Sequence, residues 1–188
     1  MNKAELRKIY LAKRTAFSDS QKLKADDLLL IKFQQLAFED VHVLLSYYPM
    51  EHTAEPNTLI YTRYLKHMIP GLTVAYPVSD FSDSSMKAIA TDEDAEFVER
   101  KGIMEPVGNT MIDPKEIDLI FVPFIICDKN GFRVGYGKGF YDRFLAECRE
   151  GVLKVGFSYF EPVDTISDTH EYDVPLNYCI TPQNIYEF

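Results

Sequence analysis

Cysteine and histidine are scarce in this chain, with three and four copies among 188 residues. Cys127, Cys148 and Cys179 are odd in number, widely spaced and not paired as CxxC. This pattern excludes a disulfide framework and a zinc knuckle and indicates a reducing compartment. The histidines show no metal-ligand spacing, which argues against a zinc enzyme.

Positive charge and long apolar runs are also limited. Lys and Arg number 20 against 29 Asp and Glu, giving a net charge of −9 that disfavours nucleic acid or an anionic membrane as a partner. The most apolar run, 119–127, contains Pro123 and is much shorter than the roughly 20 residues of a membrane span. Residues 1–14 lack the apolar stretch of a secretory signal. We therefore expect a cytoplasmic protein with no nucleic-acid or membrane partner.

What is present is the composition of a folded protein. The hydrophobic fraction is 46% and the length suits one domain, with no linker or internal repeat. We expect a single domain over 1–188.

Two helices are predicted before the first strand. Asn2 stands as an N-cap before a helix whose apolar face is marked by Leu6, Ile9, Lys13 and Phe17, with Lys3, Arg7 and Arg14 nearer the other face. Ser18 and Gln21 form a capping box ahead of a second helix over 23–36.

Strands and helices then alternate, which predicts an α/β fold, doubly wound or a close variant. Strands at 41–47 and 72–78 enclose a helix at 58–69, which makes a βαβ unit. A short strand at 86–90 and an acidic surface segment at 92–99 follow. The later elements are a strand at 118–126, a hairpin turn at 128–131, a helix at 140–148, and strands at 152–157 and 178–181.

The segment 133–143 carries the chemistry. Its alternating glycines let backbone N–H groups approach phosphate oxygens, and the helix that follows adds its N-terminal dipole. Lys138 supplies a mobile cation for a transferring phosphoryl group, Arg133 can hold oxygens in fixed geometry, and Asp142 could bind Mg²⁺. Neither the dinucleotide fingerprint nor the P-loop pattern fits this spacing. The alternative is a glycine-rich turn that serves backbone geometry only.

In its context this segment is specific. The run RVGYGKGFYDR, placed just after DLIFVPFIICDKNG, closely resembles the hallmark of the 5-formyltetrahydrofolate cyclo-ligase family. The segments KAELR near the N-terminus, GIMEP at 102–106 and YDVPLNYCIT near the end agree in order and spacing. The resemblance covers nearly the whole chain.

The resemblance implies an ATP- and Mg²⁺-dependent enzyme that converts 5-formyltetrahydrofolate to 5,10-methenyltetrahydrofolate, releasing ADP and phosphate. The formyl oxygen would attack the γ-phosphate, N10 of the folate would attack the activated carbon, and phosphate would leave. The implied fold is three-layered, with a mostly parallel sheet and helices on both faces, like ribose-phosphate isomerases and CoA transferases. Reduced folate and ATP are the implied partners, and we expect a monomer or weak homo-oligomer.

The resemblance also implies roles for individual residues. Lys138, Tyr141 and Arg133 would be catalytic, with Tyr141 beside the formyl group, and Asp142 and Asp173 would bind the metal. For Tyr141 the alternative is a core aromatic, for Asp173 a turn residue, and for Lys3 and Arg7 a solvated helix face. The implied nucleotide site comprises Lys3, Arg7, Arg133, Gly135, Tyr136, Gly137, Lys138, Gly139, Phe140 and Tyr141.

The acid that binds the pterin ring has two candidates. Glu55, three residues before Thr58, matches the family's Glu-x-x-Thr pattern but lies several residues too far from the end of the strand. Glu51 has the better distance from the strand but lacks the threonine. We favour Glu55, because Thr58 is expected to begin the next helix as its N-cap.

Two other functions stay open on the sequence alone. One is a related ATP-using enzyme with a different substrate, since the folate end departs from the family pattern. The other is a non-catalytic nucleotide- or folate-binding protein, which Lys138 together with Asp142 argues against.

Overall fold

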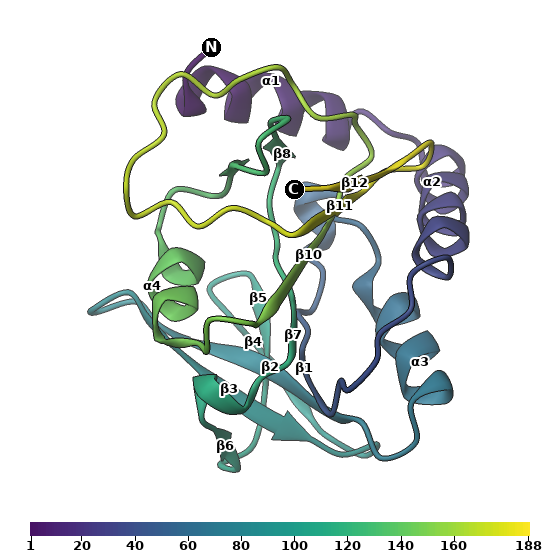
Figure 1. The fold of residues 1–188 in the computed structure, drawn as a ribbon, viewed down its shortest axis with the longest axis vertical. Helices are drawn as coiled ribbons and strands as arrows, with labels where there is room; N and C mark the ends of the chain where they lie inside the picture. The colour runs from purple at the N-terminus through teal and green to yellow at the C-terminus, as the bar shows by residue number, and fades with distance from the viewer.

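A computed structural model describes residues 1–188, which are organised around an eight-stranded mixed sheet (Figure 1). The helices are α1 (Lys3–Thr15), α2 (Asp19–Phe33), α3 (Thr58–Met68) and α4 (Phe140–Glu147), with short 3-10 helices η1 (Glu51–Thr53) and η2 (Pro114–Glu116). The sheet contains β1 (Val43–Leu45), β2 (Thr73–Asp80), β3 (Ser85–Thr91), β6 (Met111–Ile112), β7 (Leu119–Phe121), β10 (Leu153–Phe157), β11 (Tyr178–Ile180) and β12 (Ile185–Glu187). Two separate hairpins pair β4 (Phe97–Arg100) with β5 (Ile103–Pro106), and β8 (Ile126–Cys127) with β9 (Arg133–Val134).

The centre of the sheet is parallel. The strand order is β12-β11-β10-β7-β1-β2-β3-β6, and the pairs from β11 to β2 are parallel while those at both edges are antiparallel. After β1 the chain adds β2 on one side and later places β7 on the other. Such a switch point opens a crevice at the carboxyl ends of the two strands, where α/β proteins bind ligands.

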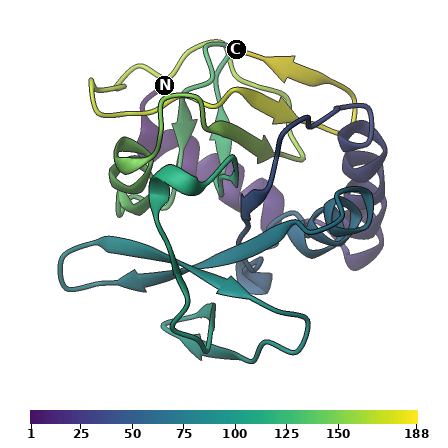
Figure 2. The ribbon, with the colours of Figure 1, turned by 60° about the horizontal axis from the view of Figure 1, so that its bottom comes forward.

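Helices cover both faces of the sheet, which confirms the expected three-layer α/β arrangement (Figures 1 and 2). On one face α2 and α3 bury an aromatic core in which Phe33 contacts the rings of Tyr61, Phe121 and Phe157. On the other face α4 packs Phe144 and Leu145 against the strands. None of the helices combines the length and apolar character needed to cross a membrane.

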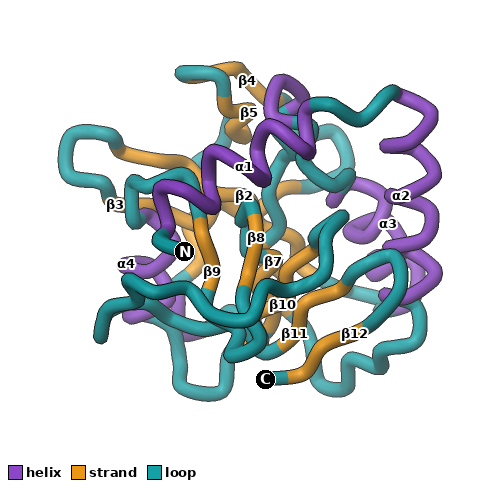
Figure 3. Tube along the Cα trace, turned by 90° about the horizontal axis from the view of Figure 1, so that it is seen from above, coloured by secondary structure: helices purple, strands orange, loops and turns teal.

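Helix α1 lies across the end of the sheet rather than on a face. Seen from above, it crosses the middle of the molecule between α4 and the α2–α3 pair (Figure 3). The Asn2 N-cap and the Ser18–Gln21 capping box are confirmed. The apolar face predicted for α1 is confirmed at Leu6, which is buried, and in part at Phe17, which packs against the core. It is wrong at Ile9 and Lys13, which are exposed, while Arg14 is buried. The second helix ends at Phe33, three residues before the predicted end.

The strand predicted over 118–126 is interrupted. Its first part, β7, ends at Phe121, and the chain resumes extended pairing only at β8. Pro123 lies in the gap and has no backbone N–H to give to a sheet ladder. The predicted turn is confirmed: the Asp128 N–H donates to the Phe132 carbonyl, and Gly131 takes a positive φ of 82° between β8 and β9.

The segment predicted as acidic surface contains a strand that the sequence analysis missed. Residues 97–100 form β4, which pairs with β5 through a turn at Lys101 and Gly102. The Phe97 ring packs edge-on against Tyr76 of β2, so the hairpin is held against the sheet. It brings the 102–106 segment to the crevice described next.

Candidate active site

A pocket of about 480 Å³ lies at the carboxyl ends of the parallel strands. It receives residues from the segment after β1, from β2, from the β4–β5 hairpin, from the 133–142 loop and from α1. Its position is the switch point between β1 and β7. Every site residue predicted from the sequence lines it except Glu51, which is exposed outside the pocket.

The glycine loop forms one end of the pocket. Gly137 and Gly139 adopt positive φ angles of 90° and 70°, conformations that side chains disfavour. Gly139 occupies the N-cap position of α4, so the loop runs directly into the N-terminus of that helix. Lys138 is exposed on the loop with its side chain on the pocket. The loop therefore offers backbone N–H groups, a helix dipole and one mobile cation to an anionic ligand.

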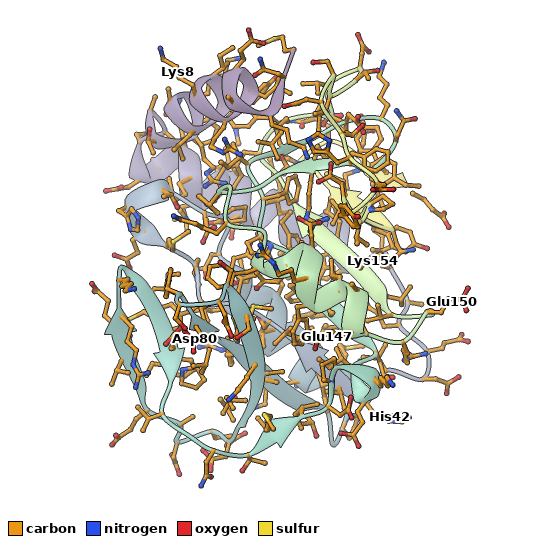
Figure 4. The ribbon with its side chains drawn as sticks, turned by 90° about the vertical axis from the view of Figure 1, so that its left-hand side faces the viewer. Lys8, His42, Asp80, Glu147, Glu150 and Lys154 are labelled. Atoms are coloured by element: carbon orange, nitrogen blue, oxygen red, sulfur yellow. The ribbon has the colours of Figure 1, made fainter.

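The first helix adds two more cations to this end. Arg7 Nε donates to the Gly135 carbonyl at 2.8 Å, and its guanidinium lies over Gly137, where a Cβ would meet Arg7 Nη2 at 3.4 Å. Lys3 Nζ pairs with Asp173 at 2.5 Å. These side chains thus face the loop rather than bulk solvent. By contrast, Lys8 extends from the outer side of α1 (Figure 4).

Two carboxylates, Asp142 and Asp173, line the pocket together with the loop. Arg133 is buried, and its Nη2 donates to Asp142 Oδ1 at 2.8 Å while its Nη1 donates to the Val174 carbonyl. The same Asp142 oxygen accepts the Val174 N–H at 3.2 Å, which joins α4 to the segment that carries Asp173. Burial would raise the pKa of Asp173, but hydrogen bonds from Lys3 and the His170 N–H lower it overall.

The other end of the pocket is built around Glu55. The side chain is 2% exposed, and its Oε2 accepts the Met50 N–H at 2.7 Å, which closes the loop after β1 on itself. The prediction that Thr58 is the N-cap of α3 is wrong, because Asn57 holds that position. Thr58 instead donates its hydroxyl to the Tyr47 carbonyl at 2.6 Å, which anchors the start of α3 to the end of β1.

Burial raises the pKa of Glu55, although several neighbours favour its charged form. These neighbours are the Met50 N–H, the Tyr136 hydroxyl at 2.6 Å, Arg14 and His52. Tyr136 comes from the middle of the glycine loop, so the loop touches the acid at the opposite end of the pocket directly.

Tyr141 stands between the two ends. Its hydroxyl is buried without any hydrogen-bond partner, and a buried unpaired hydroxyl costs stability unless a ligand satisfies it. Burial raises the pKa of Tyr141 strongly, with the charge of Glu55 raising it further and that of Arg133 lowering it. The phenol is therefore neutral and free to bond to a bound molecule.

The outer wall comes from β2 and the β4–β5 hairpin. Asp80, labelled in Figure 4, ends β2 below α1, and the neighbouring Phe81 ring meets Phe140 of α4 edge-on at 5.2 Å between centroids. Lys101 Nζ lies 4.3 Å from the centre of the Phe81 ring. Together these contacts close the pocket on the side away from α1.

Sequence reasoning missed several residues of this site. Arg14 was placed near the solvated face of the first helix, yet it is 2% exposed and reaches the loop after β1. Arg14 was already expected on one face with Arg7 and Lys3, but spacing alone did not show that Arg14 is buried there. Lys101 and Met104 were missed as pocket residues because the hairpin that carries them was not predicted.

Comparison with known proteins identifies the family. The model of the 5-formyltetrahydrofolate cyclo-ligase family matches residues 1–182. The 5-formyltetrahydrofolate cyclo-ligase of Mycoplasma genitalium is 26% identical over 182 residues, covering 95% of this chain and 98% of that protein.

Solved structures agree with this match. The 5,10-methenyltetrahydrofolate synthetase of Aquifex aeolicus is 27% identical, with a TM-score of 0.81 over 100% of this chain and 93% of that one. The corresponding synthetase of Mycoplasma pneumoniae is also 27% identical, with a TM-score of 0.75 over 96% of this chain and 98% of that one.

Proposed function

This chain belongs to the 5-formyltetrahydrofolate cyclo-ligase family, and from that premise we propose how its pocket performs the ATP-dependent cyclisation of 5-formyltetrahydrofolate to 5,10-methenyltetrahydrofolate. The observation that carries the proposal is the layout of the pocket. An anion-binding glycine loop, a buried carboxylate, Glu55, and the unpaired Tyr141 hydroxyl all line one cavity. ATP phosphates and a folate would therefore meet beside Tyr141.

The triphosphate of ATP binds at the glycine loop. The backbone N–H groups of Gly135, Gly137 and Gly139 surround the phosphates, and Arg7 and Lys3 approach them from α1. Lys138 makes no ion pair within the protein and is the cation best suited to follow the phosphoryl group during transfer. Tyr136 and Phe140 complete the loop. Arg133 has two donor nitrogens engaged by Asp142 and Val174, so it acts on the phosphates from a fixed position.

Mg²⁺ is the metal we assign to Asp142 and Asp173. No three His, Cys, Asp or Glu side chains come together as a complete metal site. A pair of carboxylates suits Mg²⁺, which binds through one or two carboxylates and takes its other ligands from water and substrate phosphates. When bound, the ion would neutralise phosphate charge. Arg133 and the Val174 N–H hold the Asp142 carboxylate in place for it.

The pterin ring binds at Glu55 rather than at Glu51. A buried carboxylate that already accepts two hydrogen bonds has acceptor capacity left for ring N–H groups. The Tyr48 ring and Met104 line the same end and offer apolar contact to a flat ring. Glu51 is exposed on η1 and lies outside the pocket wall.

The proposed chemistry has two steps. The formyl oxygen attacks the γ-phosphorus of ATP, the bond to the bridging oxygen breaks and ADP leaves. N10 then attacks the formyl carbon and loses its proton, and the carbon–oxygen bond breaks to release phosphate. Tyr141 donates a hydrogen bond that orients the formyl oxygen, and Lys138 balances the charge that develops on the transferring group.

The route of the formyl oxygen tests this mechanism. If the oxygen is phosphorylated, substrate labelled with ¹⁸O in the formyl group gives inorganic phosphate that carries the label, seen as a shifted ³¹P resonance. Phosphate without the label would show that water, not the formyl oxygen, attacks ATP, and would contradict the proposed steps.

We also propose the domain organisation, the compartment and the oligomeric state of the protein. We propose one cyclo-ligase domain over residues 1–188 that acts in the cytoplasm as a monomer or weak homo-oligomer. The three free cysteines support a reducing compartment. Sedimentation of the purified protein across a range of concentrations tests the oligomeric state.

A further inference from the structure

Tyr136 physically joins the two ends of the pocket. It lies between Gly135 and Gly137 in the nucleotide loop, but its hydroxyl donates to Glu55 Oε1 at 2.6 Å. The same hydroxyl accepts from Arg14 Nη2 at 2.5 Å and lies 3.3 Å from Thr53 Oγ1. A side chain of the ATP loop is thus part of the immediate environment of the folate acid.

Arg14 fixes the other side of this connection. Its Nε donates to the Thr53 carbonyl at 2.8 Å and its Nη1 to the Phe124 carbonyl at 2.9 Å. The guanidinium is therefore bonded to three segments: the loop that carries Glu55, the chain after β7, and the glycine loop through Tyr136. Because Arg14 is 2% exposed, these bonds form in a low-dielectric environment where they are strong.

The glycine next to Tyr136 bears on whether the two ligands strengthen or weaken each other's binding. Gly137 gives the backbone beside Tyr136 conformational freedom that is lost when phosphates order the loop. Once the loop is ordered, the Tyr136 hydroxyl is held against Glu55 at no further cost. Conversely, a pterin bonded to Glu55 fixes the acceptor of Tyr136 and thereby part of the loop. Each ligand removes an ordering cost that the other would otherwise meet.

We propose that the Arg14–Tyr136–Glu55 hydrogen bonds couple the nucleotide loop to the folate acid, so that either substrate strengthens the binding of the other. Tyr136 and Arg14 act as positioning residues in this coupling. The inference rests on the proposed function, because it takes Glu55 as the folate acid and the glycine loop as the ATP site. Coupling between sites commonly amounts to between about 5- and 150-fold in affinity, equal in both directions.

Calorimetric titration measures the coupling directly. The probes are 5-formyltetrahydrofolate and the non-hydrolysable β,γ-imido analogue of ATP with Mg²⁺, each titrated with and without the other at saturation. For the wild-type protein we expect each Kd to fall at least about fivefold when the other ligand is present. For Tyr136→Phe, which keeps the ring and removes only the hydroxyl, we expect both ligands to bind with a coupling factor near one.

Tyr10→Phe is the matched control. It removes the same hydroxyl from a tyrosine of α1 that packs edge-on against Phe160, and it should keep the full coupling. Independent binding in the wild-type protein, or coupling retained in Tyr136→Phe, would overturn the inference while leaving the proposed function in place. Failure of the wild-type protein to bind either ligand would overturn the proposed function and the inference with it.

The pH dependence of folate binding gives a second readout that a merely structural role would not move. The groups facing Glu55 are Tyr47, Tyr136, Tyr141, Tyr159, Arg14 and His52. The Tyr136 hydrogen bond lowers the pKa of Glu55, so its loss should move the acid limb of folate binding to higher pH. His52 is common to both proteins and cancels in the comparison. An unchanged acid limb in Tyr136→Phe would contradict the role of Tyr136.

Discussion

At the proposed nucleotide end of the pocket most lining groups come from eleven consecutive residues, 133–143, whereas the proposed folate end is assembled from separate segments. The loop after β1 brings Glu55, the β4–β5 hairpin brings Met104, and β2 brings Ser79 and the adjoining Phe81. The two ends also differ in solvent contact, because Lys138 is exposed and Glu55 is 2% exposed.

This contrast reflects what each substrate requires. A triphosphate is recognised by backbone N–H groups and mobile cations, which a short glycine-rich loop can supply alone. A pterin ring is recognised by a fixed carboxylate and apolar walls, which need rigid support from several elements. Changes at the first end should therefore affect turnover, and changes at the second should affect folate affinity.

Lys138→Met should give the largest effect. Removing the cation that balances the transferring phosphoryl group is expected to reduce kcat by about 10² to 10⁴, with the folate Kd little changed. Steady-state kinetics and folate titration measure the two quantities. Lys8→Met, the same change on the outer side of α1, is the control and should be silent. Near-wild-type turnover in Lys138→Met would contradict the proposal that changes at the nucleotide end affect turnover.

Glu55→Gln should act mainly on folate binding. Leaving pterin donors unpaired costs about 1–3 kcal/mol, which corresponds to roughly a 5- to 150-fold rise in folate KM. The ATP KM measured at saturating folate should stay within about twofold. Glu51→Gln makes the same change three positions into the loop after Tyr48 and should alter neither constant. A large effect in Glu51→Gln would move the pterin site to the exposed acid.

Asp142→Asn probes the metal at the nucleotide end. The side chain keeps its shape but loses its charge, so the Mg²⁺ concentration for half-maximal activity should rise by about tenfold or more, equivalent to about 1.4 kcal/mol. Direct Mn²⁺ binding followed by electron paramagnetic resonance gives a readout besides activity. Asp164→Asn, an exposed acid paired with Lys129, serves as the control. Unchanged metal binding in Asp142→Asn would reduce Asp142 to an acid that stabilises the start of α4.

The smallest expected effect is on the pH dependence of stability, which should differ between Glu55 at one end of the pocket and Asp173 at the other. Burial raises the pKa of Glu55 above its ordinary value, so the folded state binds this proton more tightly and wild-type stability falls as pH rises through that window. The lowered pKa of Asp173 contributes stability that is present above the ordinary value of 3.8 and is lost only as pH falls below it.

Urea unfolding from pH 7.5 to 4.5 tests this prediction. The difference in unfolding free energy between wild type and Glu55→Gln should change across the range in favour of the wild type at acid pH. The difference between wild type and Asp173→Asn should stay nearly constant. A constant difference for Glu55→Gln would mean that the acid has an ordinary pKa despite its burial.

The contrast between the two ends also explains what the sequence could predict. The glycine loop was recognisable because its groups are contiguous, and the capping boxes and the 128–131 turn follow from local chemistry. For the pterin acid, Glu55 was favoured over Glu51 through a predicted Thr58 N-cap that the structure does not show. The choice depends on which acid the loop after β1 turns inward. That choice is made by the Met50 N–H and the Tyr136 hydroxyl, which come from different parts of the chain.

Helix α1 shows the limit of periodicity most clearly. Apolar spacing placed Leu6, Ile9 and Lys13 on the buried face, whereas the structure buries Leu6 and Arg14 and exposes Ile9 and Lys13. The helix crosses η1 and the chain after β7, where the carbonyls of Thr53 and Phe124 need donors, so a buried arginine suits the position better than an apolar residue. Patterns that assume an apolar core cannot anticipate a helix that packs on polar strand ends.

The central claim is that both substrates react within one pocket. Mixing the protein with 5-formyltetrahydrofolate and MgATP and following the absorbance of the methenyl product tests it most directly. We predict growth of that absorbance with release of one ADP per product, none without ATP, and a rate lowered by about 10² to 10⁴ in Lys138→Met. ADP release without methenyl product, or equal product formation by Lys138→Met, would contradict this account.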